Sequence, residues 1–201
     1  KLVMGGGYAL KLPVIDISEI GAGGGSIVTL DRGGLLKVGP ESAGALPGPV
    51  CYGRGGDSPT FTDSALALGF LNPGHLIGGD LKLDADLARK VLQDKIATPL
   101  DRDLLDAAWG VYQVACGTMV RAVKAVSTYR GRDPRDFSLF AFGGNGPVVA
   151  AEIANLLDMT RVIVPPTPGV FSAFGLLLSD VEHEISRAWL NRPTQVTPAD
   201  M

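Results

Sequence analysis

The sequence has little of what marks a secreted, membrane-spanning or nucleic-acid-binding protein. Its two cysteines, Cys51 and Cys116, lie far apart and form no CxxC pair, so we expect no disulfide framework and reduced thiols, as in the cytoplasm. No stretch approaches the ~20 uninterrupted apolar residues of a membrane span. The formal net charge is −3, which argues against nucleic acid as the main partner.

Familiar catalytic motifs are also missing. The only histidines, His75 and His183, have no second ligand at metal-binding spacing, so no zinc site is predicted. We expect His75 in a loop and His183 on a solvated face, and no Ser/His/Asp triad can be assembled from them. Neither GxxxxGK[ST] nor GxSxG occurs, which excludes a P-loop and a hydrolase nucleophile elbow.

The composition is that of a globular protein with a sizeable core. Of 201 residues, 46% are hydrophobic and 19% are charged, a balance that does not favour disorder. Glycine is abundant, at 27 residues. The chain begins at Lys1 and stops at Met201 without completing an element, so we expect it to be the middle of a longer protein.

A glycine-rich turn separates two predicted strands, Leu12 to Ile17 and Ser26 to Leu30. Glycine loses more backbone freedom on folding than any other residue, so four in six positions need a reason. One interpretation is a nest of backbone N–H groups that binds an anion such as phosphate. The other is a tight turn or a close packing contact. The residues of this candidate site are Gly21, Gly23, Gly24, Gly25 and Ser26.

The next segment predicts a hairpin, a long loop and a short helix. Residues 31–34 supply the turn to a strand at 35–38. Residues 39–59 are so rich in Gly and Pro that we expect an ordered functional loop, the alternative being a disordered linker. A short helix at 64–69 follows Asp63. That carboxylate has two interpretations: it complements the helix dipole, or it orients a metal-bound water or a hydroxyl.

The remaining pattern alternates helices and strands. Helices are predicted from Leu83 to about Ile96 and from about Asp101 to Tyr129, the second on an apolar stripe of helical period. A buried strand at 137–142 runs into a second glycine turn and then a helix at 148–157, an order typical of phosphate or nucleotide sites. The turn comprises Gly143, Gly144, Asn145, Gly146 and Pro147. A strand at 161–164 and a helix at 170–178 complete an α/β pattern, with one sheet carrying helices.

Seven blocks in a fixed order resemble the hydantoinase A/5-oxoprolinase family over about residues 12–187. They are Ile20–Ile27, Val38–Ala45 with Pro47–Pro49, Cys51–Gly56, Thr60–Asp63, Asp133–Phe137, Phe142–Pro147, and Val164–Pro166 with Pro168–Ala173. The resemblance implies that residues 1–201 are a fragment of the hydantoinase A domain. The implied fold is α/β, part of an actin-like (ribonuclease H-like) ATPase fold with a mixed sheet and flanking helices.

The resemblance also implies a function and its partners. Members use ATP with Mg²⁺ to phosphorylate the carbonyl of a cyclic amide (a hydantoin, as in N-methylhydantoinase, 5-oxoproline or a lactam) before hydrolysis. A hydantoinase B-like subunit or domain usually accompanies them, so a cytoplasmic hetero-oligomer is expected. One alternative is the nucleotide-binding subunit of an ATP-dependent ketone carboxylase. The other is a non-catalytic fragment that docks a partner, and the isolated fragment is expected to be inactive.

Residue roles carried over from the family are hypotheses by analogy. Gly143 to Gly146 resembles the adenosine-side turn, the Gly21 to Ser26 turn would lie near the phosphates or substrate, and Asp63 is the expected catalytic carboxylate. Two departures stand out: the Asp-x-Gly-Gly-Thr phosphate motifs are absent, and Val149 stands where the family often has histidine. The hypothesis requires both glycine turns to converge on one nucleotide cleft.

Overall fold

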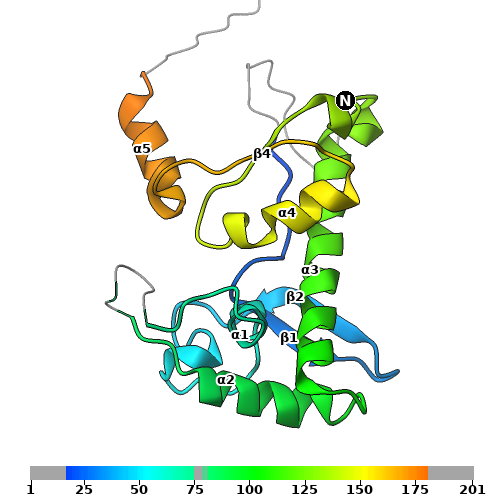
Figure 1. The fold of residues 1–201 in the computed structure, drawn as a ribbon, viewed down its shortest axis with the longest axis vertical. Coiled ribbons are helices and arrows are strands. Elements are labelled where there is room, and N and C mark those ends of the chain that lie inside the picture. The colour runs from blue at the N-terminus through cyan, green and yellow to red at the C-terminus, as the bar shows by residue number, and fades with distance from the viewer. Residues whose placement is uncertain (1–16, 75–78, 80, 181–201) are drawn as a thin grey trace, which may run out of the picture.

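The computed structural model of the chain describes residues 17–74, 79 and 81–180. Its helices and strands gather around one long helix, α3 (Leu104–Val126), which runs along one side of the molecule (Figure 1). One lobe at the first half of α3 holds β1, β2, α1 and α2, and the lobe at its other end holds α4, β3, β4 and α5. Most of the predicted strand at 12–17 lies outside the described residues, as do His75 and His183.

The predicted hairpin is confirmed as β1 (Ser26–Leu30) paired antiparallel with β2 (Leu36–Ser42). Asp31 fixes its turn by accepting hydrogen bonds from the N–H groups of Gly33 and Leu35. β2 continues through Pro40 to Ser42, beyond the predicted end of this strand at residue 38. β2 is an edge strand, where a proline costs no ladder hydrogen bond, and the register is irregular next to Ser26.

The short helix α1 (Phe61–Ala67) is the buried centre of the first lobe. All seven of its residues are buried. It begins three residues earlier than predicted, because Thr60 is its N-cap and forms a reciprocal capping box with Asp63, which satisfies two N–H groups at the helix start. The preceding loop is ordered and contains a 3₁₀ turn, η1 (Val50–Tyr52).

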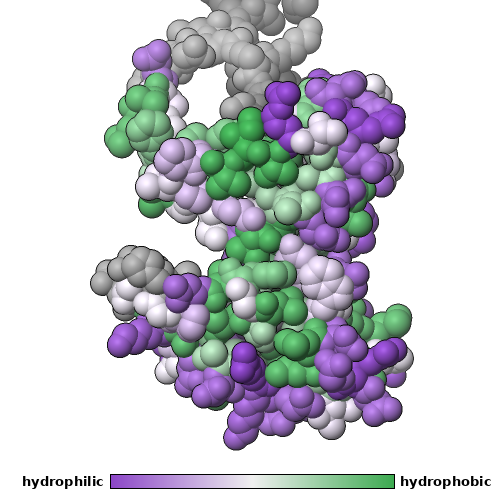
Figure 2. All heavy atoms as spheres, viewed as in Figure 1, coloured by the Kyte–Doolittle hydropathy of each residue, from purple (hydrophilic) through white to green (hydrophobic). Residues whose placement is uncertain are grey.

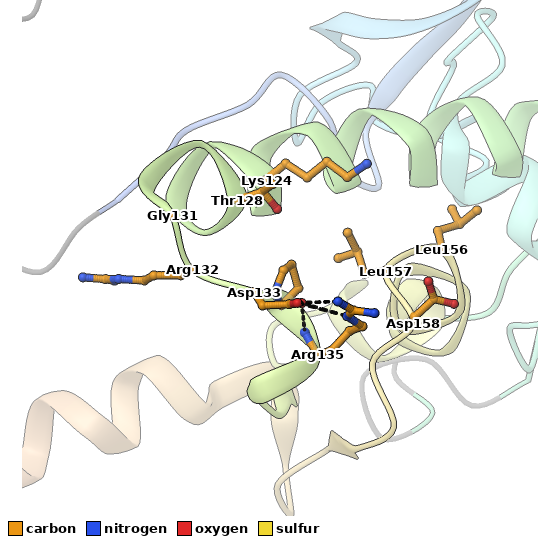
Figure 3. Close-up of a pocket in the computed structure, with 10 residues that line it drawn as sticks. Lys124, Thr128, Gly131, Arg132, Asp133, Arg135, Leu156, Leu157 and Asp158 are labelled. Atoms are coloured by element: carbon orange, nitrogen blue, oxygen red, sulfur yellow. Dashed lines mark hydrogen bonds and ion pairs between the residues drawn. The ribbon is translucent and has the colours of Figure 1, made fainter.

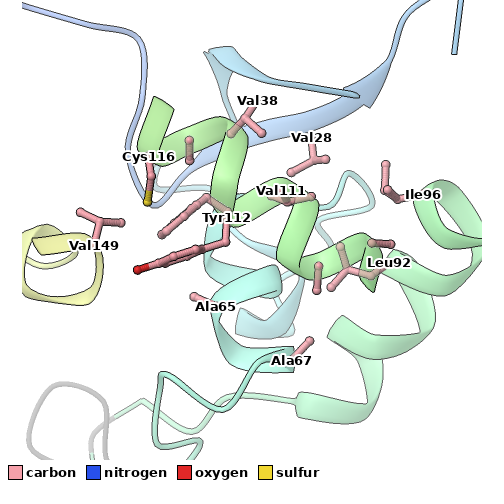
Figure 4. Close-up of a cluster of buried hydrophobic side chains, with 14 of the residues drawn as sticks. Val28, Val38, Ala65, Ala67, Leu92, Ile96, Val111, Tyr112, Cys116 and Val149 are labelled. Atoms are coloured by element: carbon pink, nitrogen blue, oxygen red, sulfur yellow. The ribbon is translucent and has the colours of Figure 1, made fainter. Parts of the chain in front are cut away.

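Both helices predicted next are present and start at aspartate N-caps. α2 (Ala85–Leu92) follows Asp84 and continues into a π-helical turn, η3 (Gln93–Ala97). α3 follows Asp103, and the 3₁₀ turn η4 (Thr128–Arg130) continues from its end. Small side chains along α3 let other elements approach closely and build the main core (Figure 4). Its fully enclosed members include Val28, Phe61, Ala65, Leu92, Ile96, Ala108, Val111 and Cys116.

The second lobe is built from short elements. A 3₁₀ turn, η5 (Pro134–Asp136), leads to β3 (Leu139–Phe140) and α4 (Gly146–Leu156). After them come β4 (Val162–Ile163), the 3₁₀ turn η6 (Pro168–Val170) and α5 (Phe171–Leu178). β3 and β4 pair in parallel, so the described residues hold two separate two-stranded sheets where one sheet was expected.

The second lobe also differs from the sequence prediction in burial. The strand at 137–142 was predicted to be buried, yet Phe140 and Phe142 are 42% and 46% exposed, and no residue of α5 is buried. Figure 2 shows the hydrophobic surface over this part of the molecule. A run of apolar residues predicts that a strand will be buried. Whether it is buried depends on the other elements that pack against it. Within the described part of the chain, no helix is both long and apolar enough to cross a membrane.

Candidate functional site

The two glycine turns meet in the structure. Gly24 faces Asn145 so closely that a Cβ built on Gly24 would overlap the Asn145 side-chain amide and lie 2.9 Å from Thr62 Oγ1. The first turn precedes β1 and the second precedes α4, so this contact joins the two lobes. The expected convergence of the turns is therefore present in the structure. Nucleotide binding at this junction stays a prediction.

Hydrogen bonds from α1 hold the first turn. The Thr62 N–H and hydroxyl donate to the Gly24 carbonyl at 3.0 and 2.9 Å, and the Gly23 N–H donates to Ser26 Oγ at 2.8 Å. Gly21 lies against Pro40, where an added Cβ would come within 2.6 Å of the proline Cβ. None of the four glycines has a left-handed φ. Close approach therefore explains Gly21 and Gly24, which supports the packing interpretation.

Both glycine turns also contain backbone N–H groups without a hydrogen-bond partner in the described part of the chain, which is compatible with the interpretation that they bind an anion. Among the described residues, no hydrogen bond takes up the N–H of Gly24 or Gly25, or of Gly144 to Gly146. Asn145 is the N-cap of α4, but its side chain makes no capping hydrogen bond. Gly143 has a φ of +83° and donates its N–H to the Pro168 carbonyl at 2.8 Å. The start of α4 thus presents free N–H groups and the positive end of a helix dipole, which fit a phosphate or a nucleotide's polar edge.

Asp63 is fully buried and its carboxylate is occupied. Oδ1 accepts the Cys51 N–H at 2.7 Å, and Oδ2 accepts the Val50 N–H at 3.2 Å and both the N–H and hydroxyl of Thr60 at 2.8 Å. These bonds tie the loop to the start of α1, a structural role in addition to the expected complement to the helix dipole. The catalytic role of Asp63 stays a prediction.

Sequence reasoning missed Tyr112, which joins the lobes beside the glycine turns. Its hydroxyl donates to the Val148 carbonyl at 3.0 Å, so α3 is tied to the first turn of α4. Its ring lies 5.1 Å from Trp109 and 5.0 Å from Phe70, between ring centroids. The only signal in the sequence was a tyrosine within the apolar stripe of a helix, where a buried hydroxyl needs a partner.

Val149, which stands where the resemblance leads us to expect histidine, belongs to the core. It is 2% exposed and lies near Tyr112 and Cys116 (Figure 4). Burial raises the pKa of the Cys116 thiol to about 11 and also raises the pKa values of Tyr112 and Cys51. Both buried thiols stay protonated at neutral pH, and a protonated thiol is a poor nucleophile.

The described residues offer more groups for binding ATP than for binding Mg²⁺. The free N–H groups at the start of α4 suit the polar groups of ATP. In the described ranges, no three His, Cys, Asp or Glu side chains cluster so as to hold a metal ion. Any Mg²⁺ bound with ATP would therefore take part of its ligands from phosphates and waters, as it commonly does. A cavity of about 460 Å³ lies at the other end of α4 and includes none of the predicted site residues (Figure 3).

Comparisons with known proteins agree on one family. The family model described as Hydantoinase/oxoprolinase matches residues 2–185. The chain is 43% identical over 177 residues to caprolactamase subunit alpha from Pseudomonas jessenii, covering 88% of this chain and 25% of that protein. It is 36% identical over 191 residues to 5-oxoprolinase 1 from Arabidopsis thaliana, covering 87% of this chain and 15% of that protein.

Solved structures show the same relationship. The crystal structure of ATP-dependent caprolactamase from Pseudomonas jessenii matches with a TM-score of 0.77 and 44% identity, over 85% of this chain and 25% of that one. A nucleotide-free structure of acetone carboxylase matches with a TM-score of 0.80 and 34% identity, over 90% and 26%. The predicted α/β fold class is thereby confirmed. The chain spans about a quarter of the length of the caprolactamase and acetone carboxylase chains and 15% of the 5-oxoprolinase.

Proposed function

Because the chain belongs to the hydantoinase/oxoprolinase family, we propose that it is part of a larger ATP-dependent enzyme that hydrolyses a cyclic amide, such as a hydantoin, 5-oxoproline or a lactam. The observation that carries this proposal is the contact of Gly24 with Asn145. It brings the turn that holds the N–H groups of Gly24 and Gly25, unpaired within the described ranges, against the start of a helix, and both features favour bound phosphate.

The chemistry requires an activated carbonyl. Amide resonance makes a lactam carbonyl a poor electrophile, and ATP, when bound, supplies the phosphoryl group that turns its oxygen into a leaving group. The N–H groups of Gly144 to Gly146 would bind and orient polar oxygens at the start of α4, and those of Gly24 and Gly25 would do so from the opposite lobe. Preorganised donors of this kind stabilise charge as it develops. We assign no step to Mg²⁺.

The likeness to acetone carboxylase favours a second candidate, the nucleotide-binding subunit of an ATP-dependent ketone carboxylase. The same turns would bind ATP there, and the substrate would differ. A third candidate is a fragment that docks a partner and binds no nucleotide by itself. In either enzyme we propose a cytoplasmic assembly with a hydantoinase B-like subunit or domain, in line with the subunit name of the caprolactamase relative.

Substrate-dependent ATP hydrolysis by the full-length protein, purified with its partner, separates these candidates. Stimulation by hydantoin, 5-oxoproline or a lactam supports the hydrolase, and stimulation by ketones with bicarbonate supports the carboxylase. Calorimetric titration of ATP into residues 1–201 and into the full-length protein tests the third candidate. Absence of ATP binding by the full-length protein would overturn both enzymatic proposals.

A further inference from the structure

Two adjoining cavities lie at the end of α4 remote from the glycine turns. One has a volume of about 460 Å³ and the other about 220 Å³, and Arg132 and Pro134 line both. They are walled by the end of α3, the turn η5 and the end of α4. α4 has 11 residues, so about 16 Å of helix separates this region from Asn145. The cavities are therefore distinct from the proposed ATP site.

Cationic side chains surround the larger cavity. Lys124 lies in the last turn of α3 and Thr128 at the start of η4, and Arg135 faces the same space from η5 (Figure 3). Asp133 holds the Arg135 guanidinium in place, accepting hydrogen bonds from Nε at 3.0 and 3.1 Å and from Nη2 at 2.6 Å. Arg135 lowers the pKa of Asp133 to about 2, so this pair persists at neutral pH.

The charge of this lining sets the charge of a ligand. Lys124 and Arg135 direct their charged groups toward the larger cavity, which also has the carboxylates Asp133 and Asp158, whereas the Arg132 side chain points away from it (Figure 3). Within the described part of the chain, neither Lys124 nor Arg132 forms an ion pair. Because Asp133 pairs with Arg135, Lys124 is the cation at this cavity that is left to complement a negative charge on a ligand.

The smaller cavity is apolar. Its wall includes four half-buried apolar side chains, Val123, Val126, Leu139 and Met159. A volume of 220 Å³ exceeds several times the ~30 Å³ that one water occupies in the liquid. Several methylene groups would therefore fit, and their burial here would be favourable.

We propose that these two cavities form a binding site for an aliphatic monocarboxylate. Its carboxylate would lie between the Lys124 ammonium, the Thr128 hydroxyl and the Arg135 guanidinium, and its hydrocarbon chain would occupy the smaller cavity. Small-molecule sites typically combine an apolar wall with a few converging polar groups in 300–1,000 Å³. The proposal is independent of ATP use, because no residue of the glycine turns takes part in it.

Hexanoate is the probe that tests this site, titrated calorimetrically into the full-length protein at constant ionic strength. We expect hexanoate to bind at least tenfold more tightly than hexan-1-ol, which lacks the charge, and than acetate, which lacks the chain. Lys124→Ala should weaken hexanoate binding about fivefold, the upper range for one solvent-accessible charge pair. Lys90→Ala removes an equal charge from the exposed face of α2 and should leave hexanoate binding unchanged.

Three results would overturn the proposal: no hexanoate binding by the full-length protein, equal binding of hexanoate and hexan-1-ol, or equal weakening by Lys124→Ala and Lys90→Ala. Lys124 is half-buried, so thermal melting of the variant establishes that it folds. If Lys124→Ala does not fold, Lys124→Gln, which keeps most of the aliphatic stem, replaces it with the same expected weakening.

Discussion

Gly24 and Asn145, from glycine turns far apart in the sequence, are in direct contact, with Thr62 on the other side of Gly24. Each turn starts an element of a different lobe: β1 follows Gly24, and α4 follows Asn145. The contact leaves no room for a side chain at position 24. Any ligand bound to the N–H groups of one turn would therefore lie beside the other, and this juxtaposition is the basis of the proposed ATP site.

Gly24→Ala should disrupt this junction. The new Cβ would overlap the Asn145 amide and press on Thr62 Oγ1, and overpacking of this kind costs about 1–3 kcal/mol. We expect a lower urea midpoint and weaker ATP binding by the full-length protein. Gly23→Ala is the matched control, since nothing lies within 4 Å of its added Cβ. Equal effects of the two substitutions would contradict the importance of the contact.

Asp63→Asn tests the two roles of the buried carboxylate. The asparagine amide offers one acceptor oxygen where four donors now bind the carboxylate, and each buried donor left unpaired costs about 1–3 kcal/mol. We expect a clear loss of stability in urea unfolding, whereas Asp57→Asn, in the same loop but exposed, should change little. ATP turnover per folded molecule then distinguishes the roles. Turnover that is retained would remove Asp63 from the catalytic residues.

The raised pKa of Cys116 predicts a stability that falls at alkaline pH. In the folded protein the thiol keeps its proton up to about pH 11, against an ordinary value of 9.0. Between these values the unfolded state binds fewer protons than the folded state, so stability falls as pH rises above about 9 and is unaffected by this group below it. Thermal melting between pH 8 and 11 measures the slope, which should be smaller in Cys116→Ala. An identical slope in wild type and variant would contradict the assignment.

Val149→His introduces the residue that the family resemblance leads us to expect at this position. At a 2% exposed position in the core, a histidine would stay neutral, because burial disfavours its charged form. The unfolded histidine gains a proton below about pH 6.5, so the variant should lose stability as pH falls through that value. Val149→Thr, of similar shape but without a titrating group, should show no added pH dependence. A histidine variant as stable at pH 5 as at pH 8 would contradict the core assignment.

Local features of the sequence determined much of this protein. Glycine placement predicted both turns, the apolar stripe predicted α3, and the Asp31 turn predicted the hairpin of β1 and β2. These features depend on residues close together in the chain, whose preferences for a turn, helix or strand are largely local. The seven sequence blocks that resemble the family, in their fixed order, predicted the fold class.

Tertiary structure decided which remote groups meet. Only packing brought Gly24 against Asn145, gave Asp63 its donors from the loop at Val50 and Cys51, and directed the Tyr112 hydroxyl to Val148. The sequence also predicted burial for the strand containing Phe140, which the described structure leaves exposed. Apolar patterning states what a segment prefers to contact, but burial and hydrogen-bond partners depend on elements distant in the chain.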